Sequence, residues 1–82
     1  MTDQAWIEAT LTSSRPQAVA ALLRYFRNLD DAEEAYQEAC LRALRNWTAK
    51  GPPRDPVAWL IMVGRNAALD QKRKTQRLVA MP

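Results

Sequence analysis

The sequence predicts an all-α fold, a compact bundle of three to four helices. Ala, Leu and Arg are abundant in its 82 residues, glycine occurs only twice, and 48% of the residues are hydrophobic. Such a composition favours helices in a folded domain, and apolar side chains recur at helical spacing along the chain. A chain of this length can bury one modest core. We therefore expect a single domain over residues 1–82, without a repeat or a low-complexity tract.

A short first segment is predicted near the N-terminus. Its apolar side chains have helical spacing, which indicates either a short helix over residues 3–11 or a tail within residues 1–13. These side chains are Trp6, Ile7 and Leu11.

A longer helix is expected to follow. Ser14 and Gln17 resemble a capping box, with Pro16 in the first turn. The helix should end near Asn28, and its apolar residues recur at i, i + 3, i + 4 and i + 7. They are Val19, Leu22, Leu23 and Phe26.

The next helix has the most regular pattern. Asp30 is expected to cap it, with Glu33 at the capping-box position and further acids near the positive end of the helix dipole. An apolar stripe then keeps the helical period over about four turns. Cys40 lies on this stripe and is predicted to be a small buried hydrophobe. The stripe consists of Ala32, Ala35, Tyr36, Ala39, Cys40, Ala43, Leu44 and Trp47.

The opposite face of this helix is acidic and carries one outward leucine. A single exposed leucine is common, so a solvated surface is the simpler interpretation. The sharper hypothesis is an acidic docking face for a protein partner, with a small apolar anchor. The face comprises Asp31, Glu34, Gln37, Glu38, Leu41 and Arg45.

A short, proline-stiffened loop should lead into the last helix. Gly51 and two prolines end the preceding helix after Trp47, and the loop carries the cations of Lys50 and Arg54. Asp55 is a good N-cap, and the proline after it suits the first helical position.

The last helix, over residues 55–77, has an apolar face and a polar face. Gly64 lies on the apolar face, where it costs about 1 kcal/mol of helix propensity; close helix packing would offset this cost. The apolar face consists of Val57, Leu60, Ile61, Gly64 and Ala68. The polar face consists of Trp59, Asn66, Asp70, Arg73 and Arg77, flanked by Arg65, Lys72 and Lys74.

The polar face combines residue types that suit nucleic acid. Cations contact phosphate, an amide contacts base edges and an aromatic ring stacks on bases. Asp70 is expected to orient Arg73 or Arg77 through a local ion pair. A simpler interpretation stays open, because a basic helix end complements the helix dipole and Trp59 could pack on a neighbouring helix.

Charge is distributed unevenly along the chain. The net charge is +3, yet residues 30–38 hold five of the nine acids and no base, whereas residues 65–77 hold five bases against one acid. A chain polarised in this way could present an acidic surface to one partner and a basic surface to another.

Composition argues against several other classes of protein. With a single cysteine and no histidine, the chain can form neither an internal disulfide nor a Cys/His zinc site. We expect no enzyme, no cofactor and no metal, because no nucleophile is paired with a base and no glycine-rich phosphate loop is present. No apolar run of about 18 residues and no signal-peptide pattern occur, so we expect a cytoplasmic protein with no membrane partner.

The order of these parts resembles the region-two domain of bacterial RNA polymerase sigma factors of the extracytoplasmic-function type. The resemblance covers about residues 16–77. It is carried by LDDAEEAYQEACLRALRNW, the Gly/Pro loop and DPVAWLIMVGRNAALDQKRK, with DAEE leading to Gln37-Glu38 and Trp59-Leu60 leading to Arg65-Asn66 and Leu69-Asp70 at the family's spacing.

The resemblance implies two binding surfaces. The acidic helix would dock on the clamp coiled coil of the largest subunit of core RNA polymerase. The loop and the last helix would read the −10 promoter element and hold its melted non-template strand. An anti-sigma protein is a further partner that the family allows. The polymerase-binding residues would be Asp31, Glu34, Gln37, Glu38 and Leu41, and the DNA-binding residues Lys50, Arg54, Trp59, Arg65, Asn66, Lys72, Arg73 and Arg77.

One departure from the family and two other functions need to be considered. Such sigma factors normally continue into a second helical domain that reads the −35 element. Nothing after Arg77 encodes one, so we expect an excised domain or a truncated relative, with residues 78–82 beginning a linker. The alternative functions are a helical protein-interaction module of sigma-like fold and a helix-turn-helix repressor of duplex DNA. The repressor is disfavoured because the Gly/Pro loop is longer than the expected turn of three to four residues.

Overall fold

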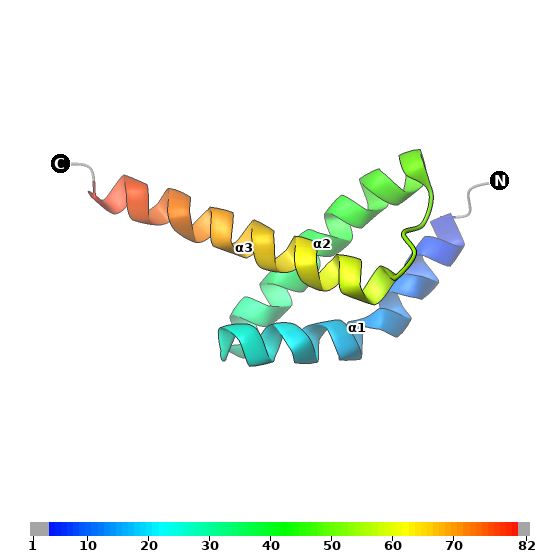
Figure 1. The fold of residues 1–82 in the computed structure, drawn as a ribbon, viewed down its shortest axis with the longest axis horizontal. Coiled ribbons are helices and arrows are strands. Elements are labelled where there is room, and N and C mark those ends of the chain that lie inside the picture. Colours follow the sequence, from blue (N-terminus) through cyan, green and yellow to red (C-terminus); the bar gives the residue numbers. More distant parts are fainter. Residues whose placement is uncertain (1–3, 81–82) are drawn as a thin grey trace.

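Three helices form the molecule in the computed structural model, which describes the backbone of residues 4–80 and the side chains of residues 4–75. They are α1 (Gln4–Phe26), α2 (Leu29–Lys50) and α3 (Pro56–Ala80), and they confirm the predicted all-α bundle. α3 crosses the other two helices, and its C-terminal half extends beyond them (Figure 1). Residues 78–80, expected to begin a linker, continue α3; residues 1–3 and 81–82 lie outside the described part.

α1 is one helix, and the predicted separation of two helices near residue 13 is wrong. Ser14 is buried with only 4% of its surface exposed, so it packs inside the bundle instead of capping a helix. Pro16 lies within the helix. An internal proline removes one backbone hydrogen bond and bends a helix, and α1 is visibly bent (Figure 1). The helix ends at Phe26, followed by Arg27 in a left-handed conformation with φ of 56°.

The bend of α1 is tied to α2 by Tyr36. Its hydroxyl donates a hydrogen bond to the backbone carbonyl of Leu11, close to the turn in which Pro16 lacks an N–H. The Arg15 guanidinium lies 5.8 Å from the centre of the Tyr36 ring and forms an ion pair with Glu33 at 2.9 Å. Burial raises the pKa of Tyr36 above its usual range, and the neighbouring thiol of Cys40 acts in the same direction.

α2 begins two residues earlier than predicted, so the assignment of Asp30 as its N-cap is wrong. Asn28 is the N-cap, and its side chain accepts a hydrogen bond from the backbone N–H of Asp31 at 3.0 Å. Asn and Asp cap helices about equally well, and Asn28 has the extended backbone conformation that a cap requires.

The C-terminal end of α2 also differs from the prediction. The helix continues to Lys50, which was expected in the loop, because no breaker precedes Gly51. Gly51 ends it with a positive φ of 87° and donates its N–H to the Trp47 carbonyl at 2.9 Å. Only Gly tolerates positive φ without steric cost.

The apolar stripe of α2 supplies much of the core, as predicted. All of its members are buried except Cys40 and Leu44, which are partly buried and pack against the core. The largest completely buried side chains come from all three helices: Ile7, Leu22, Trp47 and Leu60.

α3 begins as predicted and packs closely on α2. The Asp55 carboxylate accepts a hydrogen bond from the Ala58 N–H at 3.2 Å. Gly64 faces α2, and a Cβ added there would lie 2.8 Å from the Ala35 carbonyl oxygen and 3.5 Å from the Ala39 Cβ. The glycine therefore permits the close packing that its position on the apolar face suggests.

The three tryptophans, one from each helix, close the end of the bundle near the α2–α3 loop. The Trp6 and Trp47 rings are parallel with centroids 6.1 Å apart, and Trp59 meets Trp47 edge-on at 5.3 Å. The buried Nε1 of Trp47 has no hydrogen-bond partner, so this cluster is stabilised by apolar and aromatic contact.

We expect Gly64→Ala to destabilise the protein by about 1 to 2 kcal/mol. Alanine would gain up to about 1 kcal/mol of helix propensity, but its methyl group would overlap the Ala35 carbonyl, and overpacking costs about 1 to 3 kcal/mol. Urea unfolding followed by circular dichroism measures the net effect. Thr75→Ala, at an exposed position of α3, is the control and should leave stability nearly unchanged. A more stable Gly64→Ala variant would contradict the close crossing.

We expect the protein to lose stability above about pH 10 in a way that depends on Tyr36. Burial favours the neutral phenol of Tyr36. The contribution of Tyr36 to the free energy of unfolding is therefore complete below the ordinary tyrosine pKa, and it is lost as pH rises through the higher pKa of the folded state. Tyr36→Phe should cost about 1 kcal/mol at pH 7 through loss of the hydrogen bond to Leu11. The difference in unfolding free energy between wild type and this variant should shrink from pH 9 to pH 11. A constant difference over that range would show that Tyr36 titrates normally.

Candidate functional site

The outward face of α2 combines acids with an exposed leucine. Glu34 and Gln37 are exposed, and Leu41 has 53% of its surface exposed. The structure therefore confirms that these side chains point away from the apolar stripe. A single exposed leucine is common on protein surfaces, so its meaning depends on the charged residues around it.

Two further acids of this set, Asp31 and Glu38, are each paired with a cation. The Asp31 carboxylate is 3.9 Å from the Lys72 Nζ, and the Glu38 carboxylate is 3.3 Å from the Arg42 Nε. All four side chains remain about half exposed, so each pair contributes little to stability.

A groove of ≈ 380 Å³ separates the acidic side of α2 from α3. Its floor is formed by small side chains, and charged and amide groups line its edges. A second hollow of ≈ 220 Å³ continues it towards the end of α1 and shares Glu34, Ala68 and Gln71 with it. The groove is lined by Glu34, Ala35, Glu38, Arg42, Ala67, Ala68 and Gln71.

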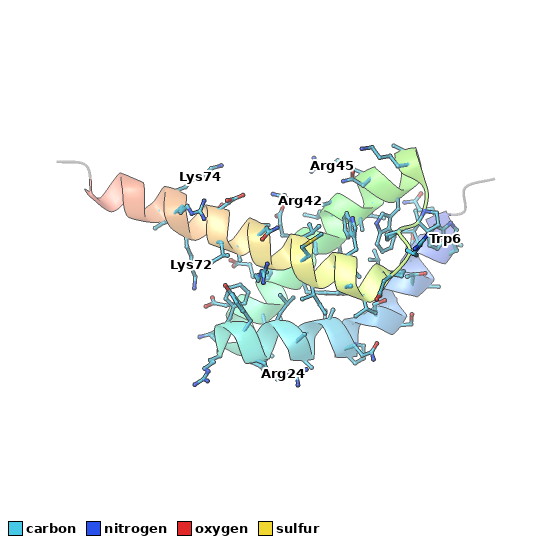
Figure 2. All side chains as sticks on the ribbon, viewed as in Figure 1. Trp6, Arg24, Arg42, Arg45, Lys72 and Lys74 are labelled. Atoms are coloured by element: carbon cyan, nitrogen blue, oxygen red, sulfur yellow. The ribbon has the colours of Figure 1, made fainter. Side chains whose placement is uncertain are left out.

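The polar side chains of α3 do not form one continuous surface. Asn66 and Arg73 are exposed on the side opposite Gly64. Lys72 and Lys74 project from different sides of the helix (Figure 2). Lys72 is turned towards the other helices, with its Nζ 5.3 Å from the centre of the Phe26 ring and near Asp31. Lys74 lies on the same edge of the molecule as Arg42 and Arg45 in Figure 2.

Two expectations for α3 concern local partners. The structure gives Asp70 no ion pair with Arg73, and the side chain of Arg77 lies outside the described residues. Trp59 is partly buried and packs against the core and against Trp47. The structure therefore favours the alternative interpretation of Trp59, packing on a neighbouring helix, over a ring that is free on the polar face.

The cations near the α2–α3 loop are accessible. Lys50 and Arg54 are both exposed, one in the last turn of α2 and the other in the loop. Positive charge is thus present at the N-terminal end of α3 as well as along its second half.

Tyr25 is an exposed aromatic residue that the sequence pattern did not predict to be part of a binding surface. This residue lies in the last turn of α1 with 51% of its surface exposed, and the Arg65 Cζ lies 5.5 Å from its ring centre. Met62, one turn before Arg65, is 49% exposed. The sequence does contain a signal for this exposure. Tyr25 lies between Arg24 and Phe26 and outside the apolar stripe of its helix, which indicates an aromatic ring on the surface.

Chemically reactive groups are not prominent in the described part of the chain. Burial raises the pKa of the Cys40 thiol, which disfavours the nucleophilic thiolate. Residues 4–75 contain no cluster of three or more His, Cys, Asp or Glu side chains that could hold a metal ion. None of the described helices combines the length and the apolar character needed to span a membrane. The arrangement offers binding surfaces made of charge, amide and aromatic groups.

Comparisons with known proteins place these surfaces in context. The family model described as Sigma-70 region 2 matches residues 11–78. An uncharacterized protein of Rhizobium meliloti (strain 1021) is 65% identical over 82 residues, which cover all of this chain and 19% of the relative. The chain thus spans about a fifth of that relative's length. No solved structure gives a significant match.

Proposed function

This chain belongs to the sigma-70 region 2 family, and on that premise we propose that it is the polymerase-docking and −10 promoter-reading domain of a sigma factor of the extracytoplasmic-function type. The family is a non-enzymatic domain of transcription factors. The resemblance of α2, the Gly/Pro loop and α3 to this type of sigma factor supports the finer assignment.

The observation that carries the proposal is the separation of two surfaces by the α2–α3 packing. Gly64 faces α2, so Asn66 and Arg73 lie on the opposite side of α3 and are exposed. Glu34 and Leu41 project from α2 away from its apolar stripe. One small domain can therefore contact an anionic and a protein partner at the same time.

The acidic face of α2 would dock on the clamp coiled coil of the largest subunit of core RNA polymerase. Gln37 and Leu41 would form its exposed centre, with Asp31, Glu34 and Glu38 at the border with α3. Leu41 would supply the apolar contact at the centre of a charged surface, and the carboxylates would favour a basic partner and fast association.

The loop and α3 would read the −10 element as a melted strand. Asn66 has an exposed amide that can donate to and accept from a base edge. Arg65, Arg73 and the cations near the loop, Lys50 and Arg54, would contact phosphate, which supplies affinity without sequence preference.

Two of the expected DNA contacts need a refined role. Lys72 would approach phosphate only by leaving Asp31, a weak exposed pair. Trp59 would act mainly by fixing the start of α3 against Trp47, with only the exposed part of its ring available to a base.

We expect reversal of the acids on α2 to weaken polymerase binding without unfolding the domain. Glu34→Lys should lower the affinity for core polymerase several-fold, and Glu34→Lys/Glu38→Lys by more, because single exposed charges each contribute about 1 kcal/mol or less. Glu8→Lys, a reversal at an exposed position of α1, is the matched control and should bind as wild type does. A pull-down on core polymerase with equal recovery of all variants would exclude α2 as the docking face.

We expect the 82-residue chain to bind single-stranded promoter DNA more tightly than the same sequence as duplex. Asn66→Ala should reduce discrimination between preferred and scrambled strands by about 1 to 3 kcal/mol. Arg73→Ala should weaken all sequences alike and reduce the dependence on salt.

Fluorescence anisotropy at low salt, where phosphate contacts are strongest, measures both effects. Equal binding of strand and duplex would favour a duplex-reading repressor. Absence of DNA binding together with retained polymerase binding would favour the protein-interaction module.

A further inference from the structure

Tyr25 is an exposed aromatic residue whose position is fixed by its neighbours. It lies in the last turn of α1, and its ring meets the Phe26 ring edge-on, with centroids 4.9 Å apart and planes at 89°. Phe26 is itself packed against the core. Half of Tyr25 nevertheless remains accessible, at 51% of its surface. A ring that is held in place and still exposed is suited to stacking on a planar ligand.

A second planar group lies over this ring and comes from a different helix. The Arg65 Cζ of α3 is 5.5 Å from the centre of the Tyr25 ring, within the range of a cation–π contact. Arg65 remains exposed, so its guanidinium keeps donors for an anion while the ring limits its freedom. Asn66, the amide proposed to read a base, is the next residue along α3.

The charges around Tyr25 favour an anionic ligand. Between Arg15 and Asn28, α1 and the turn after it contain no acid, and Arg24 and Arg27 flank Tyr25 on either side. The acid at the start of α2 that approaches α3, Asp31, is paired with Lys72. Basic residues at a helix C-terminus also complement the helix dipole, but that role does not require an exposed aromatic ring between them.

We propose that Tyr25 and Arg65 form a stacking subsite for one unpaired base of single-stranded DNA and the phosphate next to it. The base would stack on the accessible part of the Tyr25 ring, and the guanidinium would bind the phosphate. This inference rests on the proposed function and extends its DNA surface from α3 onto α1. Aromatic stacking tolerates any base, so the subsite would add affinity and position the strand while Asn66 supplies selectivity.

The test compares variants of Tyr25 in strand binding by the 82-residue chain. Tyr25→Leu keeps an apolar side chain but removes the aromatic face, and it should weaken binding about tenfold, within the range known for stacking on a single base. Tyr25→Phe keeps the face and should bind within about twofold of wild type. Leu29→Ala truncates a similarly exposed side chain (52%) outside the subsite and should have no effect. Circular dichroism verifies that each variant is folded.

A second measurement locates the base. An abasic site is moved one position at a time through the oligonucleotide, and one position should weaken wild-type binding while leaving the affinity of Tyr25→Leu unchanged. The Arg65→Lys variant keeps the charge but not the planar group, so its affinity should lie between those of wild type and Tyr25→Leu.

The outcomes separate this inference from the proposed function. If Tyr25→Leu binds as wild type does while Asn66→Ala and Arg73→Ala show their expected losses, the subsite is excluded and promoter reading by α3 stands. If Tyr25→Leu and Tyr25→Phe bind equally weakly, the Tyr25 hydroxyl and not ring stacking is responsible, and the subsite is likewise excluded. If wild type does not bind strand at all, both proposals fail.

Discussion

The close approach of the α3 backbone to α2 at Gly64 is the constraint on which the rest of the structure depends. The Ala35 carbonyl oxygen lies 2.8 Å from the position that a Cβ of residue 64 would occupy, so no other residue fits there without a shift. Small side chains on α2, such as Ala39, let the two helices come together. The crossing lies in the first half of α3, and the second half consequently extends past the bundle (Figure 1). That projection exposes the polar side chains of α3.

Contacts between residues distant in sequence hold the three helices in place around this crossing. Trp47 of α2 joins the first and third helices through Trp6 and Trp59 at the loop end of the bundle. Tyr36 holds the bent part of α1 through the carbonyl of Leu11. The tryptophan contacts hold the first turn of α3 against α2, and the Tyr36 hydrogen bond holds the bent part of α1 against α2. Both contacts are made by large aromatic side chains: Trp47 acts through ring contact alone, whereas Tyr36 adds a hydrogen bond from its hydroxyl.

Much of this fold follows from local pattern, and the departures have physical causes. The apolar period identified the buried face of α2, and Asp55 with Pro56 marked the start of α3, because these signals lie within one helix. The break predicted at Ser14 was wrong because burial of its side chain and the continuity of the helix outweighed a capping pattern. The position of Asn28 was missed because several Asn and Asp residues near that turn are comparable caps. The pairing of Tyr25 with Arg65 joins residues far apart in sequence, and no periodicity within a single helix reveals it.

The proposed phosphate contacts of α3 require the negative charge of the neighbouring acidic helix to be reduced where the two helices meet. Two of the three acids that line the hollows between α2 and α3 are paired, Asp31 with Lys72 across the interface and Glu38 with Arg42 along α2. Each pair is exposed and contributes little stability, yet each reduces the negative potential that a phosphate near α3 would experience. Charges that remain farther apart are attenuated over a Debye length of about 10 Å at 0.1 M salt. The main effect of these weak surface pairs is therefore to let the acidic face of α2 lie beside the basic residues proposed to contact phosphate on α3. Their effect on the stability of the fold is small.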